Sequence, residues 1–239
     1  MVLLSWKTKY KIKMNKIIQT SSLKKYIDKI REKNKRIVHC HGVFDLIHIG
    51  HIKHFEEAKK NGDFLIVSIT ADKFVNKGSG RPIFNQNLRA EFLSFLDHAK
   101  TMAKLAKSAL KKNKRKTGFL FKNKKAYVQY EPIGVVGIIS PWNFSLGTAM
   151  KGTIEGLLAG NNIILKPSEF TPLTIQVVKK IWDDNIGYKD AFQIINGAGD
   201  VGSMLVESNL TDIISFTGST EVGLQIAKIC SSNLKRCTL

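Results

Sequence analysis

Two histidines three residues apart, His48 and His51, are the side chains of this chain best suited to phosphate chemistry. Gly50 lies between them at an expected helix start, where a phosphate can approach unpaired backbone amides and the positive end of the helix dipole. Two imidazoles held there can stabilise the charge that develops on a phosphorus atom under in-line attack. The pattern predicts a site for a nucleoside triphosphate, with the second substrate's own phosphate as the nucleophile.

One βαβ unit must position these histidines. Its expected members are a strand over residues 36–40, a helix from about residue 50 to 60 and a buried strand over residues 64–69. Asn61 and Gly62 are a natural helix stop, and the last strand is continuously apolar, as buried parallel strands are. Ser21 or Ser22 is expected to cap a preceding helix, and residues 88–96 are expected to form a following one.

The string GVFDLIHIGH, from Gly42 to His51, resembles the nucleotidylyltransferases, whose hallmark is H-x-G-H after the first strand. Within them it is similar to the glycerol-phosphate cytidylyltransferases and heptose-phosphate adenylyltransferases, and the likeness spans about residues 23–97. It implies transfer of NMP from CTP or ATP, with Mg²⁺, to a phosphorylated polyol or sugar. It also implies that His48 and His51 are catalytic. The nucleotide-binding residues implied are Gly42, Val43, Phe44, Asp45, Gly50 and Arg89.

Clustered histidines also bind zinc, and residues 39–54 contain five of them. Zinc needs ligands that converge in space, and a βα loop with a phosphate-cradling glycine explains the same residues better. We therefore expect no metal site formed by the protein itself. Cys40 has no base beside it in the pattern and is expected to pack in the core.

Three blocks of sequence after residue 125 indicate a dinucleotide site: YEPIGVVGIISPWNF, LLAGNNIILKPSEFTPL and DIISFTGSTEVG. Apolar strand-length runs alternate with helical stripes here, which predicts an α/β fold with a parallel sheet. Pro141 and Trp142 would shape a turn at the carboxyl end of a strand, where ligands of open α/β sheets bind. Asn143 supplies an amide there, and Gly218 and Ser219 would open the final helix beside a pyrophosphate.

These blocks resemble aldehyde dehydrogenases over roughly residues 100–239 and indicate the NAD-binding domain of that family. The resemblance implies that Asn143 forms the oxyanion hole and that Lys166 and Glu169 hold the adenosine ribose of NAD or NADP. Thr217 would face the nicotinamide side. The complete set of implied cofactor-binding residues is Ile139, Ser140, Pro141, Trp142, Lys166, Ser168, Glu169, Gly199, Gly202, Phe216, Thr217, Gly218, Ser219 and Val222.

Residues 197–202 match G-x-G-x-x-G letter for letter. The standard dinucleotide fingerprint also needs an acid at the end of the next strand, about 20 residues on, whereas Glu221 falls in the first turn of a helix. The resemblance instead places Gly199 and Gly202 near the adenine. A plain loop is the alternative for these two glycines.

In the aldehyde dehydrogenase family, the Thr-Leu that matches Thr238 and Leu239 is followed directly by ELGG, whose glutamate is the general base. The nucleophilic cysteine lies further along, and Cys230 and Cys237 match no nucleophile motif. Thioester chemistry needs both a thiolate and a base. We therefore expect no aldehyde oxidation by a polypeptide of residues 1–239.

The formal net charge of +19 is concentrated in two tracts. Residues 1–36 hold 12 of the 38 basic residues and residues 100–125 hold 11, so 15 basic residues face 17 acidic ones elsewhere. A solvated helix face and linker is the favoured interpretation. Non-specific nucleic-acid binding is a lesser alternative, because aromatic residues are not interleaved in the tracts as base stacking would require.

The change of motifs and charge along the chain predicts an α/β fold class, with two partial parallel-sheet, Rossmann-like units in series. The expected segments are a basic leader (1–22), a nucleotidylyltransferase-like fragment (23–97), a basic linker or helix (98–125) and an aldehyde dehydrogenase NAD-binding fragment (126–239). Within the third segment, residues 100–116 are expected to be helical, and residues 119–130 a hairpin or extended pair.

Three functional hypotheses follow: a fusion of two enzyme fragments, a catalytically inactive nucleotide-binding product of gene fusion or truncation, and a basic nucleic-acid-associated protein. The expected partners are nucleotides and small-molecule substrates, with possible self-association through uncovered sheet edges. No apolar run approaches the roughly 18–20 residues that span a bilayer. Without that or a signal-peptide pattern, and with three unpaired-looking cysteines, the expected location is cytoplasmic and no membrane partner is expected.

Overall fold

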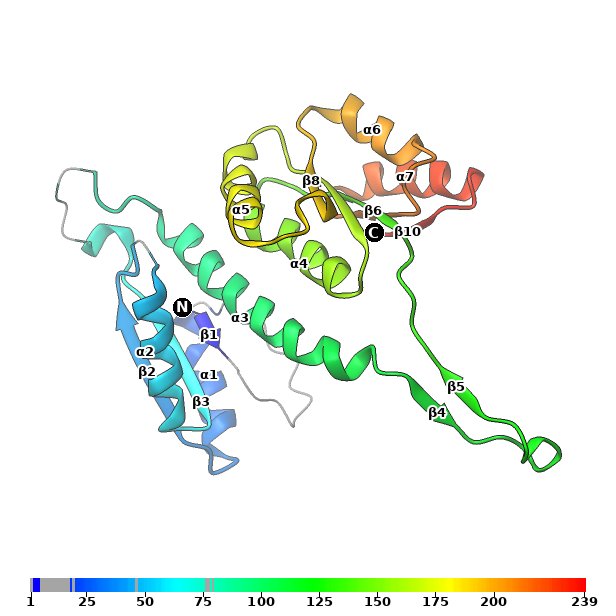
Figure 1. The fold of residues 1–239 in the computed structure, drawn as a ribbon. Coiled ribbons are helices and arrows are strands. Elements are labelled where there is room, and N and C mark those ends of the chain that lie inside the picture. The colour runs from blue at the N-terminus through cyan, green and yellow to red at the C-terminus, as the bar shows by residue number, and fades with distance from the viewer. Residues whose placement is uncertain (1, 5–17, 19, 46, 76–77, 79) are drawn as a thin grey trace. The chain divides into compact units, whose positions relative to one another are not determined.

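The computed structural model describes residues 2–4, 18, 20–45, 47–75, 78 and 80–239. The chain divides into two compact units, residues 1–98 and 99–239, and each is described by itself (Figure 1). Most of the predicted basic leader, residues 1–22, lies outside the described residues. No helix in the described part of the chain is long and apolar enough to cross a membrane.

The first unit contains a small sheet with the strand order β1-β3-β2. Its elements are β1 (Val2–Leu4), α1 (Thr20–Arg31), β2 (Ile37–Gly42), α2 (Ile49–Lys60), β3 (Phe64–Ile69), a 3₁₀ turn η1 (Asp72–Phe74) and α3 (Gln86–Ala109), which runs through the boundary between the units. β2 and β3 pair in parallel, which confirms the predicted βαβ unit. β1, which no sequence pattern predicted, pairs antiparallel with the other side of β3.

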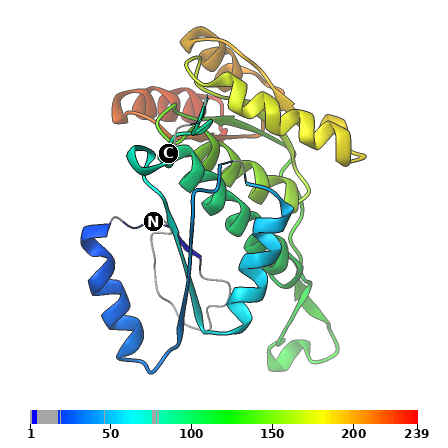
Figure 2. The same ribbon diagram turned by 90° about the vertical axis from the view of Figure 1, so that its left-hand side faces the viewer.

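Helices cover both faces of this sheet (Figures 1 and 2). On one face Leu65 and Val67 of β3 pack against Phe55 of α2 and Leu93 of α3. On the other face, side chains of α1 pack over Phe64 and its neighbours at the amino ends of the strands. The alternation of side chains along β2 and β3 therefore separates two apolar layers.

The second unit is built on a five-stranded sheet whose pairs are all parallel, with the order β10-β9-β6-β7-β8. Its strands are β6 (Val135–Ile139), β7 (Asn162–Lys166), β8 (Phe192–Ile194), β9 (Ile213–Phe216) and β10 (Arg236–Thr238). Its helices are α4 (Ser145–Leu158), α5 (Pro172–Asn185), a 3₁₀ turn η3 (Lys189–Ala191), α6 (Gly199–Glu207) and α7 (Thr220–Ser232). α4 and α5 lie on one side of the sheet, and α6 and α7 on the other (Figure 1).

The strand order creates a switch point at β6. The chain moves from β6 outward through β7 and β8, then returns to the opposite side of β6 with β9 and β10. Open α/β sheets bind their ligands where the order reverses, outside the carboxyl ends of the strands. The fold thus selects the loops after β6, β7 and β9 as the place for a site.

Between α3 and β6 the chain forms a two-stranded hairpin. β4 (Asn113–Arg115) pairs antiparallel with β5 (Ala126–Val128), and a 3₁₀ turn η2 (Phe119–Phe121) lies between them. The prediction that both strands lie within residues 119–130 is therefore wrong. The first strand, β4, precedes that range and lies in the basic tract. The expected separate helices over residues 88–96 and 100–116 are one continuous helix that ends at Ala109.

Candidate functional site

The backbones of three strands of the second unit meet at the carboxyl edge of the sheet. Ile139, the last residue of β6, is paired with Lys166 of β7 on one side and Phe216 of β9 on the other. Ser140 N–H donates to the Lys166 carbonyl (3.2 Å), and Thr217 N–H donates to the Ile139 carbonyl (3.1 Å). This ladder brings residues predicted from three separate sequence blocks to one edge.

Lys166 is the only lysine that the described part of the chain buries, at 4% exposure. Its ammonium donates to the Pro167 carbonyl (3.3 Å) and lies 3.9 Å from the half-exposed carboxylate of Glu169. A buried ammonium is unfavourable unless it is paired, and this one has three donors to satisfy. Lys166 and Glu169 therefore offer a donor and an acceptor side by side, a combination that suits the hydroxyls of a ribose.

Two hydroxyls near this edge are buried with no hydrogen-bond partner among the described residues: Ser140 Oγ and Thr171 Oγ1. Such unsatisfied groups are uncommon in a native interior, and each one calls for a physical explanation. Ser140 lies directly after β6, at the switch point. Its unmet hydrogen bond fits a polar ligand at this position.

The amino end of α7 provides backbone donors at the same edge. Ser219 is the N-cap, and its hydroxyl accepts the N–H of Val222 (3.3 Å). Gly218 precedes it and lies beneath the ring of Phe216: a methyl group added there would be 2.3 Å from Phe216 Cζ. A larger residue would require the Phe216 ring or the loop to shift, because the loop passes close over the end of β9.

The remaining predicted cofactor residues differ in exposure. Ser168 and Gly202 are buried, and Gly202 lies beside the Lys166 side chain. Gly199 begins α6 in open space. Trp142 is 60% exposed, and Asn143 is exposed just before α4. Pro141 is half-buried.

The cysteines of the chain do not form a nucleophilic site in the structure. Cys230 is fully buried in α7, and this burial, followed by the neighbouring Cys237, raises the pKa of its thiol. Burial also raises the pKa of Cys40 in the first unit. Because the thiolate is the nucleophile, a raised pKa disfavours the reactive form of both thiols, although Cys40 Sγ lies 3.6 Å from His54 Nε2. Cys237 is half-buried on β10.

In the first unit, His48 is the N-cap of α2. Its Nδ1 accepts the N–H of Gly50 (3.1 Å), and the Nδ1 of His51 accepts the N–H of His48 (3.3 Å). The two rings stack with centroids 3.8 Å apart. Because both Nδ1 atoms accept, each neutral ring carries its proton on Nε2, and these N–H groups can donate to a phosphate oxygen.

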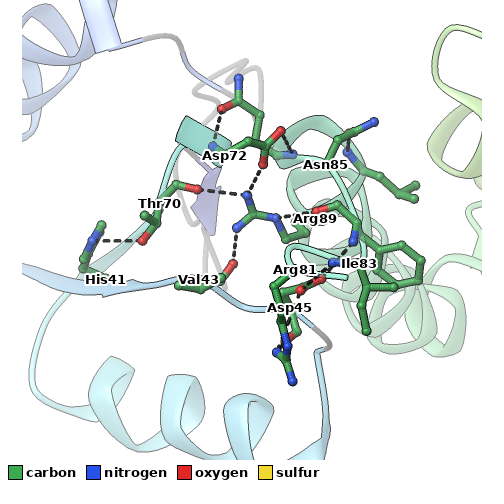
Figure 3. Close-up of polar contacts among 12 residues, drawn as sticks. His41, Val43, Asp45, Thr70, Asp72, Arg81, Ile83, Asn85 and Arg89 are labelled. Carbon is green, nitrogen blue, oxygen red and sulfur yellow. Dashed lines mark hydrogen bonds and ion pairs between the residues drawn. The ribbon is translucent and has the colours of Figure 1, made fainter. Parts of the chain in front are cut away.

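The loop before α2 is held by the carboxylate of Asp45, whose side chain is buried (Figure 3). It accepts the backbone N–H groups of Ile83 (2.7 Å) and Phe84 (2.9 Å). Burial alone would raise its pKa, but these hydrogen bonds, together with the cations Arg81 and Arg89, lower the pKa below 3.8. Asp45 therefore stays ionised and joins the loop after β2 to the segment before α3.

Arg89 completes this connection from α3 (Figure 3). It is 0% exposed, and it donates to the carbonyls of Val43, Thr70 (2.9 Å) and Phe84 (2.9 Å) and to the carboxylate of Asp72 (2.5 Å). The sequence predicted a phosphate contact, whereas the structure gives the guanidinium no exposed surface. The sequence analysis did not single out Asp72. The pattern that could have indicated it is an acidic residue just after the carboxyl end of β3.

Phe44 adopts a left-handed conformation (φ 54°) and folds its ring back over Gly42. With Ile47, Phe84, Arg89 and Phe92 it lines a cavity of about 50 Å³. This volume holds a few water molecules and is too small for a nucleobase. A left-handed non-glycine residue costs roughly 1–2 kcal/mol and persists where the surroundings impose it, often at functional loops.

Comparison with known proteins places the second unit in a defined family. The model of the aldehyde dehydrogenase family matches residues 76–239, so it covers neither His48 nor His51. Aldehyde dehydrogenase B of Escherichia coli is 42% identical over 115 residues, which are 48% of this chain and 22% of that protein. The benzaldehyde dehydrogenase [NAD(+)] of Pseudomonas putida is 39% identical over 112 residues, 46% of this chain and 23% of that protein.

Solved structures show the same relationship. An aldehyde dehydrogenase of Mycobacterium tuberculosis complexed with NAD⁺ matches 61% of this chain with a TM-score of 0.56 and 29% identity, and the match covers 29% of that chain. Staphylococcus aureus AldH in a substrate-bound state matches 64% with a TM-score of 0.59 and 28% identity, covering 33% of that chain. The chain therefore spans about a quarter to a third of the length of these relatives.

Proposed function

Because the chain belongs to the aldehyde dehydrogenase family, we propose that residues 99–239 bind NAD or NADP along the carboxyl edge of the five-stranded sheet. The observation that carries this proposal is the convergence of the buried Lys166, the unpartnered Ser140 hydroxyl and the amino end of α7 at the switch point. Such an edge supplies both hydrogen-bond donors and a positive dipole end to a dinucleotide.

In this proposal Lys166 and Glu169 hold the adenosine ribose, and the backbone of Gly218 and Ser219 faces the pyrophosphate. Ser140 and Thr217 border the nicotinamide half. The bound dinucleotide would supply a hydride acceptor. Asn143, exposed before α4, would donate its amide to the oxygen of an aldehyde substrate. Removing one such donor costs about 10²–10³ in rate in enzymes that use one.

We further propose that NAD is preferred to NADP. The Glu169 carboxylate can accept from a ribose 2′-hydroxyl but repels a 2′-phosphate. Calorimetric titration should show tighter binding of NAD than of NADP. The Glu169→Gln variant should narrow that preference, and Glu207→Gln, on the exposed end of α6, should leave it unchanged. Equal affinities in the unmodified protein would refute the preference, and failure to bind either dinucleotide would refute the function.

We propose that a polypeptide of residues 1–239 binds the dinucleotide without oxidising aldehydes. Within these residues, Cys230 is buried with a raised pKa, and Cys40, whose Sγ lies 3.6 Å from His54 Nε2, is buried in the core of the first unit and also has a raised pKa. Incubation with NAD and an aldehyde should produce no NADH above the rate of a boiled control. Sustained NADH formation that depends on Asn143 would contradict this proposal.

A second candidate function rests on the stacked pair of His48 and His51 at the amino end of α2. We propose that the first unit binds the triphosphate of CTP or ATP with Mg²⁺ and transfers NMP to a phosphorylated polyol or sugar. Release of pyrophosphate should be lost in His48→Gln and kept in His98→Gln. Nucleotide binding without release would leave an inactive binding fragment, and absence of binding would reject this candidate.

A further inference from the structure

A second pair of histidines in the first unit lies apart from the His48–His51 pair in sequence and takes part in neither proposed function. His39 and His41 are two residues apart on β2 and therefore project from the same face of the sheet. Their neighbour in register on β3 is Ser68, which pairs with His41. His39 Nε2 and His41 Nδ1 each lie 2.7 Å from Ser68 Oγ. Two ring nitrogens thus converge on one oxygen atom.

The hydrogen-bonding groups of this cluster form a chain that allows two arrangements of protons. The second nitrogen of His41, Nε2, lies 3.3 Å from Thr70 Oγ1. A serine hydroxyl has one proton, so it can donate to only one of the two rings. Two chains satisfy these contacts: Ser68 accepts from His39 Nε2–H and donates to His41 Nδ1, or it donates to His39 Nε2 and accepts from His41 Nδ1–H. In both arrangements Thr70 Oγ1 orients the His41 ring.

The position of the cluster leaves it open to solvent. Towards the amino ends of the strands this face is apolar, and Phe64 and Ile66 are buried beneath α1. Towards the carboxyl ends the face becomes polar, and His39 and His41 are exposed. Their ring centroids are 6.4 Å apart with the planes tilted by 47°, so the rings are not stacked on one another.

We propose that His39 and His41 chelate a divalent transition-metal ion, with the Ser68 hydroxyl and water completing its coordination. Each of the two ring nitrogens lies 2.7 Å from Ser68 Oγ, so they are at most twice 2.7 Å apart. Two metal–imidazole bonds of about 2.0–2.1 Å need a separation shorter than this limit. Exposed side chains reach this with small rotations about χ1 and χ2. A metal-bound histidine typically donates its other N–H to a protein oxygen. With the metal on His39 Nε2 and His41 Nδ1, the His39 proton lies on Nδ1 and the His41 proton on Nε2, where Thr70 Oγ1 at 3.3 Å can accept it.

The ligand chemistry also predicts an order of affinity. Imidazole suits Cu²⁺, Ni²⁺ and Zn²⁺, and affinity for a given nitrogen site is highest for Cu²⁺. The site departs from the expectation that the protein itself forms no metal site, because that expectation treated the five histidines as one cluster. The structure separates them, with His39 and His41 on the strand and His48, His51 and His54 at the loop and helix.

The proposal is tested by titrating the untagged full chain with Cu²⁺ and recording electron paramagnetic resonance spectra. We expect one bound ion with splitting from two nitrogens. His39→Gln and His41→Gln should each weaken binding by about a hundredfold, because the second ligand of a chelate acts at a high effective concentration. The control is the double variant His48→Gln/His51→Gln, which should bind as the unmodified chain does.

Circular dichroism of every variant shows whether the fold is kept, and a direct measurement avoids substitution altogether. With Zn²⁺, ¹⁵N NMR of the imidazoles should show coordination through Nε2 of His39 and Nδ1 of His41. Copper binding that survives in the His39→Gln/His41→Gln double variant would overturn the proposal. Loss of the site in His48→Gln/His51→Gln would overturn it equally.

Discussion

The protonation of His51 is decided by its immediate surroundings. Burial lowers the pKa of His51 below 6.5, and the neighbouring His48 and His54 lower it further. The folded unit therefore binds this proton less tightly than the unfolded chain does. The stability that follows is present above pH 6.5 and is lost as the pH falls through the folded pKa.

We predict that His48→Gln raises the pKa of His51 without bringing it fully to 6.5, because burial remains the largest cause. Titration of the imidazole signals by NMR measures this directly, and His39→Gln is the control that should leave the value unchanged. A His51 pKa at or above 6.5 in the unmodified protein would contradict the prediction.

Replacing Arg89 should lower the stability of the whole first unit. Arg89→Met would leave three buried carbonyls and the Asp72 carboxylate without their donor. An acceptor left without its donor costs about 1–3 kcal/mol, less at Asp72, whose side chain is 38% exposed, so we expect a total loss of about 3–5 kcal/mol. The matched control is Arg81→Met, which removes a half-exposed side chain and should cost under about 1 kcal/mol.

Urea denaturation followed by circular dichroism compares the two variants. A loss for Arg89→Met no larger than that for Arg81→Met would show that the guanidinium does not hold the loop after β2.

The elements of the second unit differ in how closely their glycines approach other atoms. A methyl group at Gly218 would overlap the Phe216 ring, whereas nothing lies within 4 Å of one at Gly199. We predict that Gly218→Ala displaces the loop before α7, lowers the melting temperature and weakens dinucleotide binding at least about tenfold. Gly199→Ala should leave the melting temperature unchanged. The affinity of this variant for the dinucleotide tests the predicted contact between Gly199 and the adenine. Equal melting temperatures for the two variants would contradict this prediction.

α6 ends against the ammonium of Lys235, which donates to the carbonyls of Val206 (2.6 Å) and Ser208 (2.7 Å) and to the hydroxyl of Thr211 (2.9 Å). A cation at a helix carboxyl end satisfies carbonyls that the helix leaves unpaired. Lys235→Met should destabilise the second unit by about 2–3 kcal/mol in chemical denaturation. Lys228→Met, on the exposed face of α7, should change the unfolding free energy little. Similar losses in both variants would argue against the capping role.

The division into two compact units predicts separate responses to ligands. A dinucleotide that binds only the second unit stabilises that unit by about 2.7 kcal/mol at a hundred times its dissociation constant. Scanning calorimetry with NAD should therefore raise the transition assigned to residues 99–239. The melting temperature of the first unit should not change with NAD. CTP or ATP with Mg²⁺ should instead raise the transition of the first unit and leave that of the second unchanged. A single transition shifted by both ligands would contradict independent sites.

Charge and exposed apolar surface bear on the behaviour of the whole molecule. The hairpin of β4 and β5 exposes Phe119, Leu120 and Phe121 beside several lysines, and Lys122 lies 4.2 Å from the centre of the Phe119 ring. Aromatic and basic side chains are thus closer together than the sequence indicated. Self-association and salt-dependent nucleic-acid binding remain predictions, which sedimentation at low and high salt can distinguish.

Most local elements could be predicted from the sequence because apolar periodicity, caps and stops act over a few residues. β3 has the expected bounds, Asn61 ends α2, and Ser219 caps α7. The predictions of secondary structure were wrong where contacts with residues far along the chain decide which element forms. α1 begins at Thr20 rather than after a serine cap, and β4 formed in a tract expected to be helical because β5 lies beside it.

The sequence by itself determined the α/β fold class, the motif blocks and the residue types that can grip phosphates and a dinucleotide. Only the tertiary structure decided which of them meet. It paired β7 and β9 with β6 to join three blocks at one edge, buried Arg89 among four acceptors, and brought His39 and His41 to the same serine. The physical reason is that strand pairing and burial depend on contacts between residues far apart in the chain, which no local pattern records.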